Sequence, residues 1–339
     1  MPRSVRLAFA TCLGVVALLG ALALITVASV RVIEEAHPPS GRFVPVEGGR
    51  LHVLELGDPG APPVVVLHGA GTNLEDMRLA IGDRLAASFH AILIDRPGHG
   101  WSDRPGGSKD ASPLRQAMLT HQALAQIGIK RAILLAHSWS GALATAYALD
   151  YPESVSGLVL VAPLTHPWPI TVAWHDSIIT ATLATGASLA AGKVSGPLFS
   201  RTLALPFGKL LHGLSVQSAF APQTPPQDYI ARTGGELLLR PSEFTANAQD
   251  ITQLRPFLEA QAPRYGAIHI PTAILVGDVD EVAPPEFQAR ALAKSLPHSE
   301  LVTLPGVGHM LHFAAPDTVI DAVVRLQKRD WQYAAGRSD

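Results

Sequence analysis

The stretch AILLAHSWSG at residues 132–141 decides the fold of this chain. It opens with four apolar residues that predict a short buried strand, and a helical run, Ala142–Asp150, follows at once. Ser138 lies at the turn between them, with the small residues Ala136 and Ser140 two positions away on either side. A serine on a sharp strand-to-helix turn presents its hydroxyl above the sheet, although glycine is more usual at the flanking positions. The stretch thus indicates a nucleophilic serine, with a serine that caps the helix as the alternative.

Short continuous apolar runs recur along the chain. They are Val64–Leu67, Ala91–Ile94, Leu158–Val161, Ala273–Val276 and Leu301–Leu304. Such runs are typical of parallel strands that are covered on both faces. Helical segments lie between most of these runs, and they include Pro113–Gly128, Pro285–Ser295 and Pro316–Arg329. A hairpin formed by Phe43–Val46 and Leu51–Leu56 precedes the first run. We therefore expect an α/β fold, a mostly parallel sheet flanked by helices.

The alternation stops at residues 165–269, which carry few charges and are rich in Pro, Gly, Ala and Leu. Because a loop of that length without secondary structure is abnormal in a compact domain, we expect a helical insertion. Within it, Ser177–Gly192 is free of charge but too short for a second membrane span. We expect a buried or lid helix there, with a surface that leans on lipid as the alternative. The core then comprises residues 37–164 and 270–339.

Residues 1–36 form a separate N-terminal unit. Leu7–Val30 contains no charged residue, and a helix of that length crosses a hydrocarbon core of about 30 Å. A cleavable signal peptide has a shorter apolar region, and a buried core helix would need a partner sheet, so we expect a retained single-pass membrane anchor. Arg3 and Arg6 precede the run, which favours an N-terminus inside and the bulk of the chain outside the cytoplasm.

The composition excludes several classes of protein. Hydrophobic residues make up 47% of the 339 positions and charged residues 16%, so the chain is too apolar for a disordered protein. With 26 Lys and Arg against 28 Asp and Glu, it has no broad positive field for nucleic acid. The single cysteine, Cys12, excludes an intrachain disulfide and a thiolate metal cluster. Patterns for HExxH metal sites and phosphate loops are absent from the sequence.

A glycine-rich segment, residues 67–71 (LHGAG), follows the first apolar run. Flexible glycines such as Gly69 let a backbone N–H, that of Ala70, point to where a carbonyl oxygen would gain negative charge. The N–H of Trp139 is the expected second donor. We expect His68 to support this loop through hydrogen bonds rather than to transfer protons.

An acid and a histidine follow the last two apolar runs. Asp280, in Gly277-Asp278-Val279-Asp280, can fix the tautomer of an imidazole, and Asp278 is its rival. His309 lies on the glycine-rich loop at residues 305–309 and can take and return a proton near neutral pH. His312 is the competing histidine, but it begins the next apolar stretch, which favours a structural role.

The order Ser138, Asp280, His309 is the one found in α/β-hydrolases, and residues 43–329 resemble that superfamily. Residues 95–102 (DRPGHGWS) are similar to a loop common in these enzymes, in which we expect Asp95 and His99 to be structural. The resemblance implies that the insertion is a cap over the site. A serine at the nucleophile position, rather than the aspartate of haloalkane dehalogenases and epoxide hydrolases, implies acyl transfer to water.

The expected function is therefore that of a serine hydrolase. It would cleave a carboxylester of an uncharged, hydrophobic acyl group, a small-molecule or lipid-like substrate, through an acyl-enzyme, without metal or organic cofactor. A peptidase, an amidase or a carbon–carbon hydrolase could use the same three residues. The alternative of a different class is a membrane-tethered binding module without activity.

Overall fold

The computed structural model describes residues 2–168, 191–192 and 195–335. Its centre is an eight-stranded sheet in the order β1-β2-β4-β3-β5-β6-β7-β8. The strands are β1 (Arg42–Val46), β2 (Gly49–Leu56), β3 (Pro63–Leu67), β4 (His90–Ile94), β5 (Ala132–His137), β6 (Val155–Val161), β7 (Thr272–Gly277) and β8 (Ser299–Leu304). The β1–β2 and β2–β4 pairs are antiparallel, and the other five pairs are parallel. The predicted α/β class and the hairpin are confirmed.

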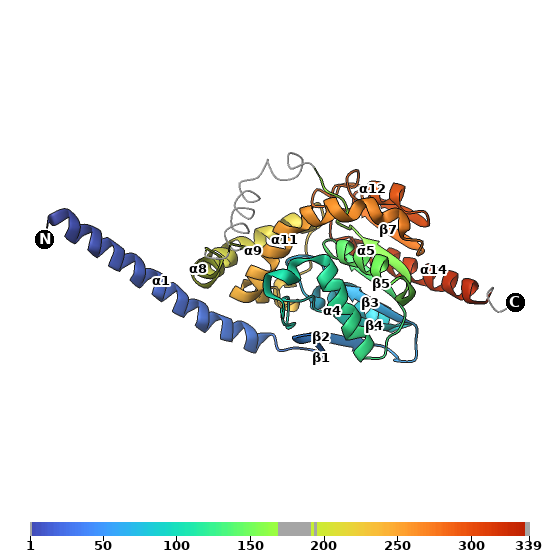
Figure 1. Ribbon diagram of the computed structural model, residues 1–339, viewed down its shortest axis with the longest axis horizontal. Helices are drawn as coiled ribbons and strands as arrows, with labels where there is room; N and C mark the ends of the chain where they lie inside the picture. The colour runs from blue at the N-terminus through green and yellow to red at the C-terminus, as the bar shows by residue number, and fades with distance from the viewer. Residues whose placement is uncertain (1, 169–190, 193–194, 336–339) are drawn as a thin grey trace.

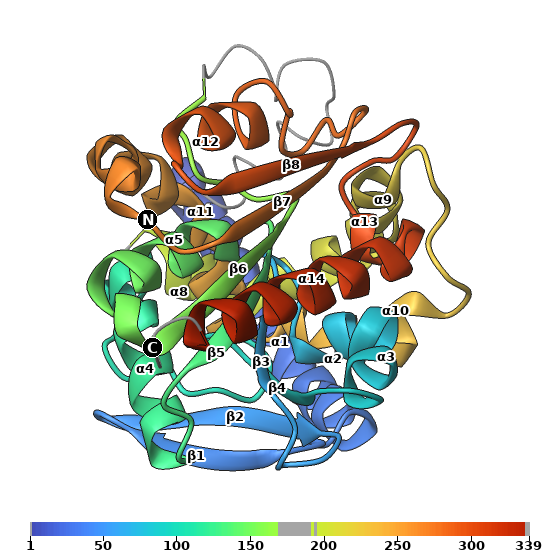
Figure 2. The same cartoon turned by 90° about the vertical axis from the view of Figure 1, so that its right-hand side faces the viewer.

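Alternate residues of each strand feed two separate cores. In β3, Val65 and Leu67 enter one cluster while Val64 and Val66 enter the other, because successive side chains point to opposite faces. One face is covered by α4 (Pro113–Gln126), α5 (Ser140–Asp150) and α12 (Ala289–Ser295). The other is covered by α2 (Leu74–Met77), α3 (Asp83–Ala86) and α14 (Pro316–Ala335), and Figure 2 shows the two layers on either side of the twisted sheet.

Further short elements complete the core. A π-helical turn, η1 (Arg78–Gly82), joins α2 to α3, and α13 (Leu311–Ala314) precedes α14. Two 3-10 turns are η2 (Gly107–Ala111) and η3 (Pro152–Ser154). The α2–η1–α3 segment was not anticipated from the sequence.

One helix begins later than its sequence suggests. The pattern predicts a helix from Pro285, but α12 begins at Ala289. The backbone of Gln288 (φ −110°, ψ −82°) lies outside the helical region, and its side-chain oxygen accepts from the amides of Thr165 and His166 at 2.8 and 3.0 Å. The side chain of Gln288 thus joins the start of the insertion to the second core part, and this contact favours a non-helical turn.

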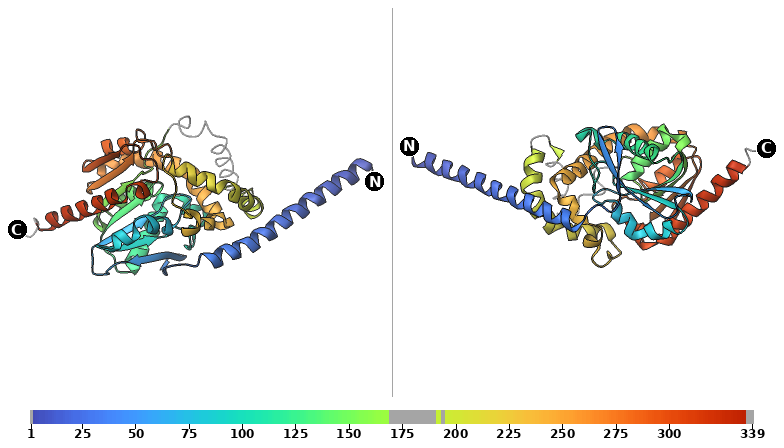
Figure 3. Two further views of the ribbon diagram at one scale, coloured as in Figure 1. Left: turned by 180° about the vertical axis from the view of Figure 1, so that it is seen from behind. Right: turned by 90° about the horizontal axis from the view of Figure 1, so that it is seen from below.

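The described part of the insertion is helical. It comprises α8 (Ser195–Thr202), α9 (Ala204–Phe220), α10 (Tyr229–Arg232), η4 (Gly235–Leu239), α11 (Pro241–Gln261) and η5 (Ala262–Ala267). Apart from residues 191 and 192, the expected helix Ser177–Gly192 lies outside the described residues. We call α8, α9, α10, η4 and α11 the cap. α8, α9 and α11 lie at the end of the molecule from which α1 projects, and the C-terminus lies at the opposite end (Figures 1 and 3).

The N-terminal unit is a single helix, α1 (Arg3–Ala36), of 34 residues. Within the described chain it is the one helix that is long and apolar enough to cross a membrane. Most of its side chains are exposed, including that of Cys12. The helix extends well beyond the sheet domain (Figure 3).

Candidate active site

Ser138 lies at the sharp turn between β5 and α5. Its φ is 53°, a left-handed conformation that is rare for a residue with a side chain. Its amide donates to the carbonyl of Val161 at 3.0 Å, and its carbonyl accepts from the amides of Gly141 and Leu164 at 2.8 and 2.9 Å. A Cβ on Gly141 would lie 2.6 Å from the Cβ of Pro163, so only glycine fits beneath the turn. These contacts hold the strained residue in place.

The residues that flank Ser138 are small because the turn is crowded. Ala136 is fully buried in the core, and the hydroxyl of Ser140 donates to the carbonyl of His68. Ser140, which stands where glycine is more usual, therefore links the turn by a hydrogen bond to the glycine-rich loop at residues 67–71.

Ser138, His309 and Asp280 form one hydrogen-bonded chain. The Oγ atom of Ser138 lies 2.9 Å from Nε2 of His309, and Nδ1 of His309 lies 2.9 Å from Oδ2 of Asp280. All three are buried, with exposures of 5%, 5% and 3%. With Nδ1–H donating to the carboxylate, Nε2 is left to accept the hydroxyl proton of Ser138. This is the geometry that a nucleophile, a general base and an orienting acid require.

The second oxygen of Asp280 is held by the backbone. Its Oδ1 accepts from the amides of Val282 and Ala283 at 2.9 and 2.8 Å, which fixes the direction of the carboxylate. The rival acid, Asp278, points elsewhere, since its Oδ1 accepts from the amide of Gly306 at 2.7 Å. The rival histidine, His312, binds Oδ2 of Asp76 through Nε2 at 3.0 Å.

The glycine-rich loop lies directly against Ser138. A Cβ on Gly69 would come within 3.2 Å of the Cβ of Ser138 and 2.9 Å of Nδ1 of His137. The amides of Ala70 and Trp139 donate to no other residue in the part of the chain that the structure describes. Two free N–H groups beside a serine hydroxyl are the kind of donors that stabilise a developing oxyanion.

His68 is engaged on both ring nitrogens. Its Nδ1–H donates to the carbonyl of Gly69 at 2.8 Å, and its Nε2 accepts from the amide of Arg96 at 3.0 Å. Burial, and then the nearby charge of Arg96, hold the pKa of His68 well below its usual range. The neutral ring therefore stays in one tautomer and braces the loop.

A buried network that the sequence reasoning missed surrounds this loop. Arg96 donates to the carbonyls of His68 and Gly69 at 3.2 and 3.1 Å, and through Nη1 to Oδ2 of Asp250 at 2.7 Å. Its guanidinium also lies 4.1 Å from the ring centroid of Trp139. Asp250 belongs to α11, so the cap is linked through Arg96 to the loop that carries Ala70, one of the two candidate oxyanion donors. Asp250 is one of three aspartates in the insertion, and no motif in the sequence distinguishes it from the other two.

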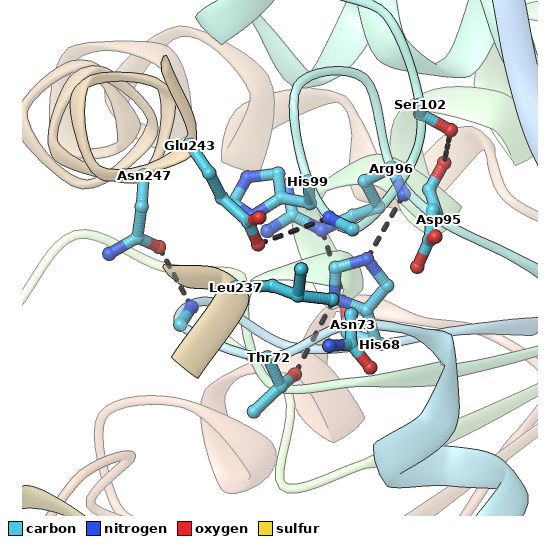
Figure 4. Close-up of polar contacts among 12 residues, drawn as sticks. His68, Thr72, Asn73, Asp95, Arg96, His99, Ser102, Leu237, Glu243 and Asn247 are labelled. Atoms are coloured by element: carbon cyan, nitrogen blue, oxygen red, sulfur yellow. Dashed lines mark hydrogen bonds and ion pairs between the residues drawn. The ribbon is translucent and has the colours of Figure 1, made fainter. Parts of the chain in front are cut away.

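The cap makes a second contact with the same loop. Oδ1 of Asn247, also on α11, accepts from the amide of Gly71 at 2.8 Å. Figure 4 shows Asn247 reaching from the helix on one side, with His68 and Arg96 in contact on the other. The loop is therefore held by polar groups of both α11 and the core.

Asp95 and His99 lie within this network. Asp95 accepts from the amides of Leu74 and Trp101 at 2.8 and 2.9 Å and binds Nδ1 of His52 at 2.7 Å. His99 binds Oδ2 of Asp250 at 2.9 Å, and burial lowers its pKa to about 4. Neither residue contacts Ser138 or His309, so both hold the loops beside the site.

One cluster has the donor types of a metal site. Ligand atoms of Asp76, His137 and His312, all buried, lie within 4.8 Å of one another. The carboxylate of Asp76 already accepts from the hydroxyl of Tyr229 at 2.5 Å and binds His312, and Nε2 of His137 lies 3.3 Å from the carbonyl of His309. These hydrogen bonds give the cluster a structural role beneath His309.

A cavity of about 220 Å³ lies away from Ser138, between the end of α1, α2 and the cap. Its lining includes His37, Asn73, Trp101 and Leu237. It therefore does not contain the hydrogen-bonded chain of Ser138, His309 and Asp280.

Comparison with known proteins gives a consistent family. A family model described as the alpha/beta hydrolase fold matches residues 62–316, more than half of the chain. A 2-hydroxy-6-oxononadienedioate/2-hydroxy-6-oxononatrienedioate hydrolase of Klebsiella pneumoniae is 36% identical over 129 residues, 36% of this chain and 44% of that protein. A pimeloyl-[acyl-carrier protein] methyl ester esterase of Edwardsiella ictaluri is 42% identical over 103 residues, 30% of this chain and 37% of that protein. The chain thus spans less than half the length of both relatives.

Solved structures agree in fold. A membrane phospholipase A, described as a bacterial virulence factor, superposes with a TM-score of 0.64 at 24% identity, covering 94% of this chain and 97% of that one. A putative lipase of Acinetobacter baumannii gives a TM-score of 0.66 at 20% identity, covering 91% and 97%. At these identities the likeness extends to the fold alone.

Proposed function

This chain belongs to the alpha/beta hydrolase family and is an enzyme of the hydrolase type, and from that premise we propose that it is a serine hydrolase that cleaves carboxylesters. The observation that carries the proposal is the chain of two 2.9 Å contacts from Ser138 through His309 to Asp280. The three residues come from three separate loops at the carboxyl ends of β5, β7 and β8. Open α/β sheets build their sites at that edge.

The proposed reaction proceeds through an acyl-enzyme. His309 takes the proton of Ser138 as its Oγ attacks the acyl carbonyl, and Asp280 stabilises the imidazolium that forms. The amides of Ala70 and Trp139 donate to the oxyanion, and His309 returns the proton to the leaving alcohol. A water, deprotonated by His309, then attacks the acyl carbon. The bond from that carbon to Oγ of Ser138 breaks, His309 returns the proton to Oγ, and the acid is released as the second product.

The substrate we propose is an uncharged ester with a hydrophobic acyl group. The charge-poor insertion 165–269 serves as a cap above the core parts 37–164 and 270–339, and its apolar composition suits such a group. The Edwardsiella relative is named as a methyl ester esterase, which supports ester chemistry. The Klebsiella relative is named as a hydrolase of an oxo-dienedioate, so carbon–carbon bond hydrolysis is the second candidate.

We propose that α1 is a single-pass anchor in a membrane. Its apolar run, residues 7–30, is long enough to span the hydrocarbon core, and Arg3 and Arg6 favour an N-terminus on the cytoplasmic side. The catalytic domain would then lie outside the cytoplasm. Extraction of membranes with alkaline carbonate tests the anchor, because a protein held only by surface contacts is released into the supernatant.

Labelling with a fluorophosphonate tests the nucleophile. The wild-type protein should become labelled and Ser138→Ala should not, because the reagent traps an activated serine. Ser140→Ala is the matched control, since Ser140 lies two residues away and its hydroxyl donates to His68 rather than to His309. Label on Ser138→Ala, or its loss only in Ser140→Ala, contradicts the assignment.

A panel of substrates tests the reaction. p-Nitrophenyl esters of rising chain length should be hydrolysed, with kcat/KM rising as the acyl chain lengthens. An oxo-dienoate tests the competing carbon–carbon bond hydrolysis, and an aminoacyl anilide tests the competing peptidase or amidase activity. Cleavage of either of these without cleavage of any ester would overturn the proposed substrate class while leaving the serine mechanism intact.

A further inference from the structure

The C-terminal half of α1 is not free on all sides. Two residues of the helix are almost fully buried, Thr26 and Ile33, each 2% exposed. Partly buried residues continue the same stripe at helical spacing, so that it comprises Leu19, Leu22, Ala23, Thr26, Ser29, Val30 and Ile33. Such spacing marks one face of a helix that packs against protein. Thus one face of the anchor is covered and the remaining faces are bare.

Except for Ile33, the stripe lies inside the apolar run, residues 7–30. Thr26 is four residues before Val30, about 6 Å along the helix axis, and Leu19 is about 16 Å before it. If residues 7–30 occupy a hydrocarbon core of about 30 Å, Leu19 lies near its middle. Protein that covers this stripe must therefore itself be at membrane depth.

The covering elements belong to the cap. Of the described elements, α8 and η4 pack against α1. Leu205, Leu237 and Leu239 enclose Ile33. Figures 1 and 3 show α8 close to α1, with the cap at the end of the domain from which α1 projects. The depth of α1 in the membrane consequently fixes the depth of α8.

Polar contacts hold this arrangement together at the end of α1. Nη1 of Arg240 lies 3.2 Å from Oε1 of Glu34, and Nη2 of the same arginine lies 2.7 Å from Oε2 of Glu243 in α11. The indole of Trp101 donates to the carbonyl of His37 at 3.0 Å. The cap is thus attached to both the anchor and the core, and cannot swing away from α1 without breaking buried contacts.

The adjoining helix α9 presents an uncharged face. Its exposed apolar side chains, Phe207, Leu210 and Leu214, recur at helical spacing and are 54%, 72% and 43% exposed. Pro206, Gly213 and Gln217 share the face and carry no charge, and Leu198 of α8, 56% exposed, adds to it. An exposed apolar face of this kind needs a partner.

We propose that the cap enters the bilayer beside α1, with Leu198 of α8 and the apolar face of α9 in contact with the acyl chains of one lipid leaflet. The inference rests on the anchor in the proposed function. Lipid is the occupant because α1 carries this face to membrane depth. The enzyme would then take its ester from the leaflet in which the cap is immersed.

Depth-dependent fluorescence quenching tests the immersion without any assay of activity. The full chain, with Cys12→Ser and Leu210→Cys, is labelled with an NBD fluorophore and placed in phosphatidylcholine vesicles that contain a lipid with a nitroxide on its acyl chain. Wild-type protein labelled at Cys12 is the positive control, and Cys12→Ser with Asp321→Cys, at an exposed position on α14, is the negative control. Quenching at residue 210 should be comparable with that at Cys12 and several-fold greater than at residue 321.

The outcomes separate this proposal from the others. Quenching at Cys12 but not at residue 210 overturns the immersed cap and leaves the anchor standing. No quenching at Cys12 overturns both, whereas ester hydrolysis and fluorophosphonate labelling would be unaffected. Quenching at residue 210 equal to that at residue 321 also counts against the proposal, because it shows only general proximity to vesicles.

Charged substitutions on the apolar face of α9 test whether its contact with lipid matters for hydrolysis. Phe207→Asp with Leu210→Asp should lower hydrolysis of a bilayer-resident ester by about tenfold or more, because two apolar contacts with lipid are lost. Hydrolysis of a soluble short-chain ester should stay within about twofold. Leu114→Asp, at an apolar position on α4 that is 41% exposed, is the control and should change neither rate. Equal loss on both substrates would point to damage to the fold and overturn the lipid contact.

Discussion

Arg96 and Asp250 form a fully buried ion pair across the boundary between the core and the cap. Their Nη1 and Oδ2 atoms are 2.7 Å apart, and both side chains have no exposed surface. The same arginine donates to the carbonyls of His68 and Gly69, and the backbone carbonyl of Asp250 accepts from the indole of Trp139 at 3.1 Å. The pair therefore positions both of the backbone segments proposed to bind the oxyanion.

Removing the charge of Asp250 should destabilise the protein strongly. Asp250→Asn leaves the Arg96 guanidinium buried without its main counter-charge, and loss of one partner of a buried pair typically costs about 3–5 kcal/mol. Urea unfolding in detergent, followed by tryptophan fluorescence, measures the free energy of unfolding. Glu259→Gln on the same helix is the control, since its pair with Arg255 is solvent-exposed and contributes under about 1 kcal/mol. Equal losses in the two variants would show that the buried pair has no special role.

The proposed triad should behave as one unit. Ser138→Ala or His309→Ala should lower kcat by about 10⁴- to 10⁶-fold, and the double variant should lose little more, because either change already abolishes nucleophilic attack. Asp280→Asn should be milder. Asp278→Asn is the matched control, because this acid binds Gly306 and does not contact His309. Ester hydrolysis at saturating substrate gives the rates, and additive losses in the double variant would argue against a shared mechanism.

Much of this site could be predicted from local sequence. Ser138, Asp280 and His309 each directly follow a short apolar strand, and parallel strands bring such residues to one edge of the sheet. The Arg96–Asp250 pair could not be predicted in this way. Its members are 154 positions apart, and neither lies in a pattern that specifies its partner. An ion pair between the core and the cap depends on how the cap packs against the core, and the local periodicity of the sequence carries no information on that packing.

The same limit explains the differences in the fold. The strands were predicted to within a few residues, because a short apolar run without alternation indicates a parallel strand that is buried on both faces. The start of α12 was predicted four residues early, since the bonds from Gln288 to Thr165 and His166 that favour a non-helical turn are also distant in sequence. The short α2–η1–α3 segment lacks a long helical period, so no clear signal announced it.

Adding a methyl group to Gly69 should damage catalysis more than stability. Its Cβ would lie 2.9 Å from Nδ1 of His137 and 3.2 Å from the Cβ of Ser138, so the loop must shift away from the serine. A shift that withdraws the Ala70 amide should lower kcat/KM by about 10²- to 10³-fold, the usual effect of losing one oxyanion donor. Ala70→Gly keeps that amide and serves as the control, with most of the activity expected to remain. Unchanged kcat/KM in Gly69→Ala would rule out the loop as a donor.

Buried histidines should make the protein sensitive to acid. Burial lowers the pKa of His99 to about 4 and those of His68 and His137 well below 6.5. Between about pH 6.5 and 4 the unfolded chain therefore binds protons that the native state does not, and stability falls as the pH falls. Burial raises the pKa of Glu243 to about 7, so its contribution has the opposite sign and is lost as pH rises through that value. The effect of Glu243 on the pH dependence of stability is opposite to that of the three histidines. Because the histidines are more numerous, the net effect is that acid destabilises the protein.

His99→Gln measures one part of this pH dependence. Each such histidine contributes a slope of up to about 1.4 kcal/mol per pH unit to the free energy of unfolding. Urea unfolding between about pH 4.5 and 6 should show the slope reduced by roughly that amount in His99→Gln. His298→Gln, at an exposed position, should keep the wild-type slope. A slope in His99→Gln that matches that of the wild type would mean that His99 is charged in the folded protein.

The turn at Ser138 should carry strain that glycine relieves. With φ at 53°, a residue with a Cβ pays about 1–2 kcal/mol that glycine does not, partly offset by the greater entropy of glycine in the unfolded chain. Both Ser138→Gly and Ser138→Ala remove the hydroxyl and its bond to His309, so comparing them isolates the backbone. The free energy of unfolding of Ser138→Gly should be about 1 kcal/mol higher than that of Ser138→Ala. Within α5 the order should reverse, with Ala144→Gly less stable than the wild type by at least about 0.5 kcal/mol. If alanine is as stable as glycine at position 138, the turn is relaxed and the serine is held there without strain.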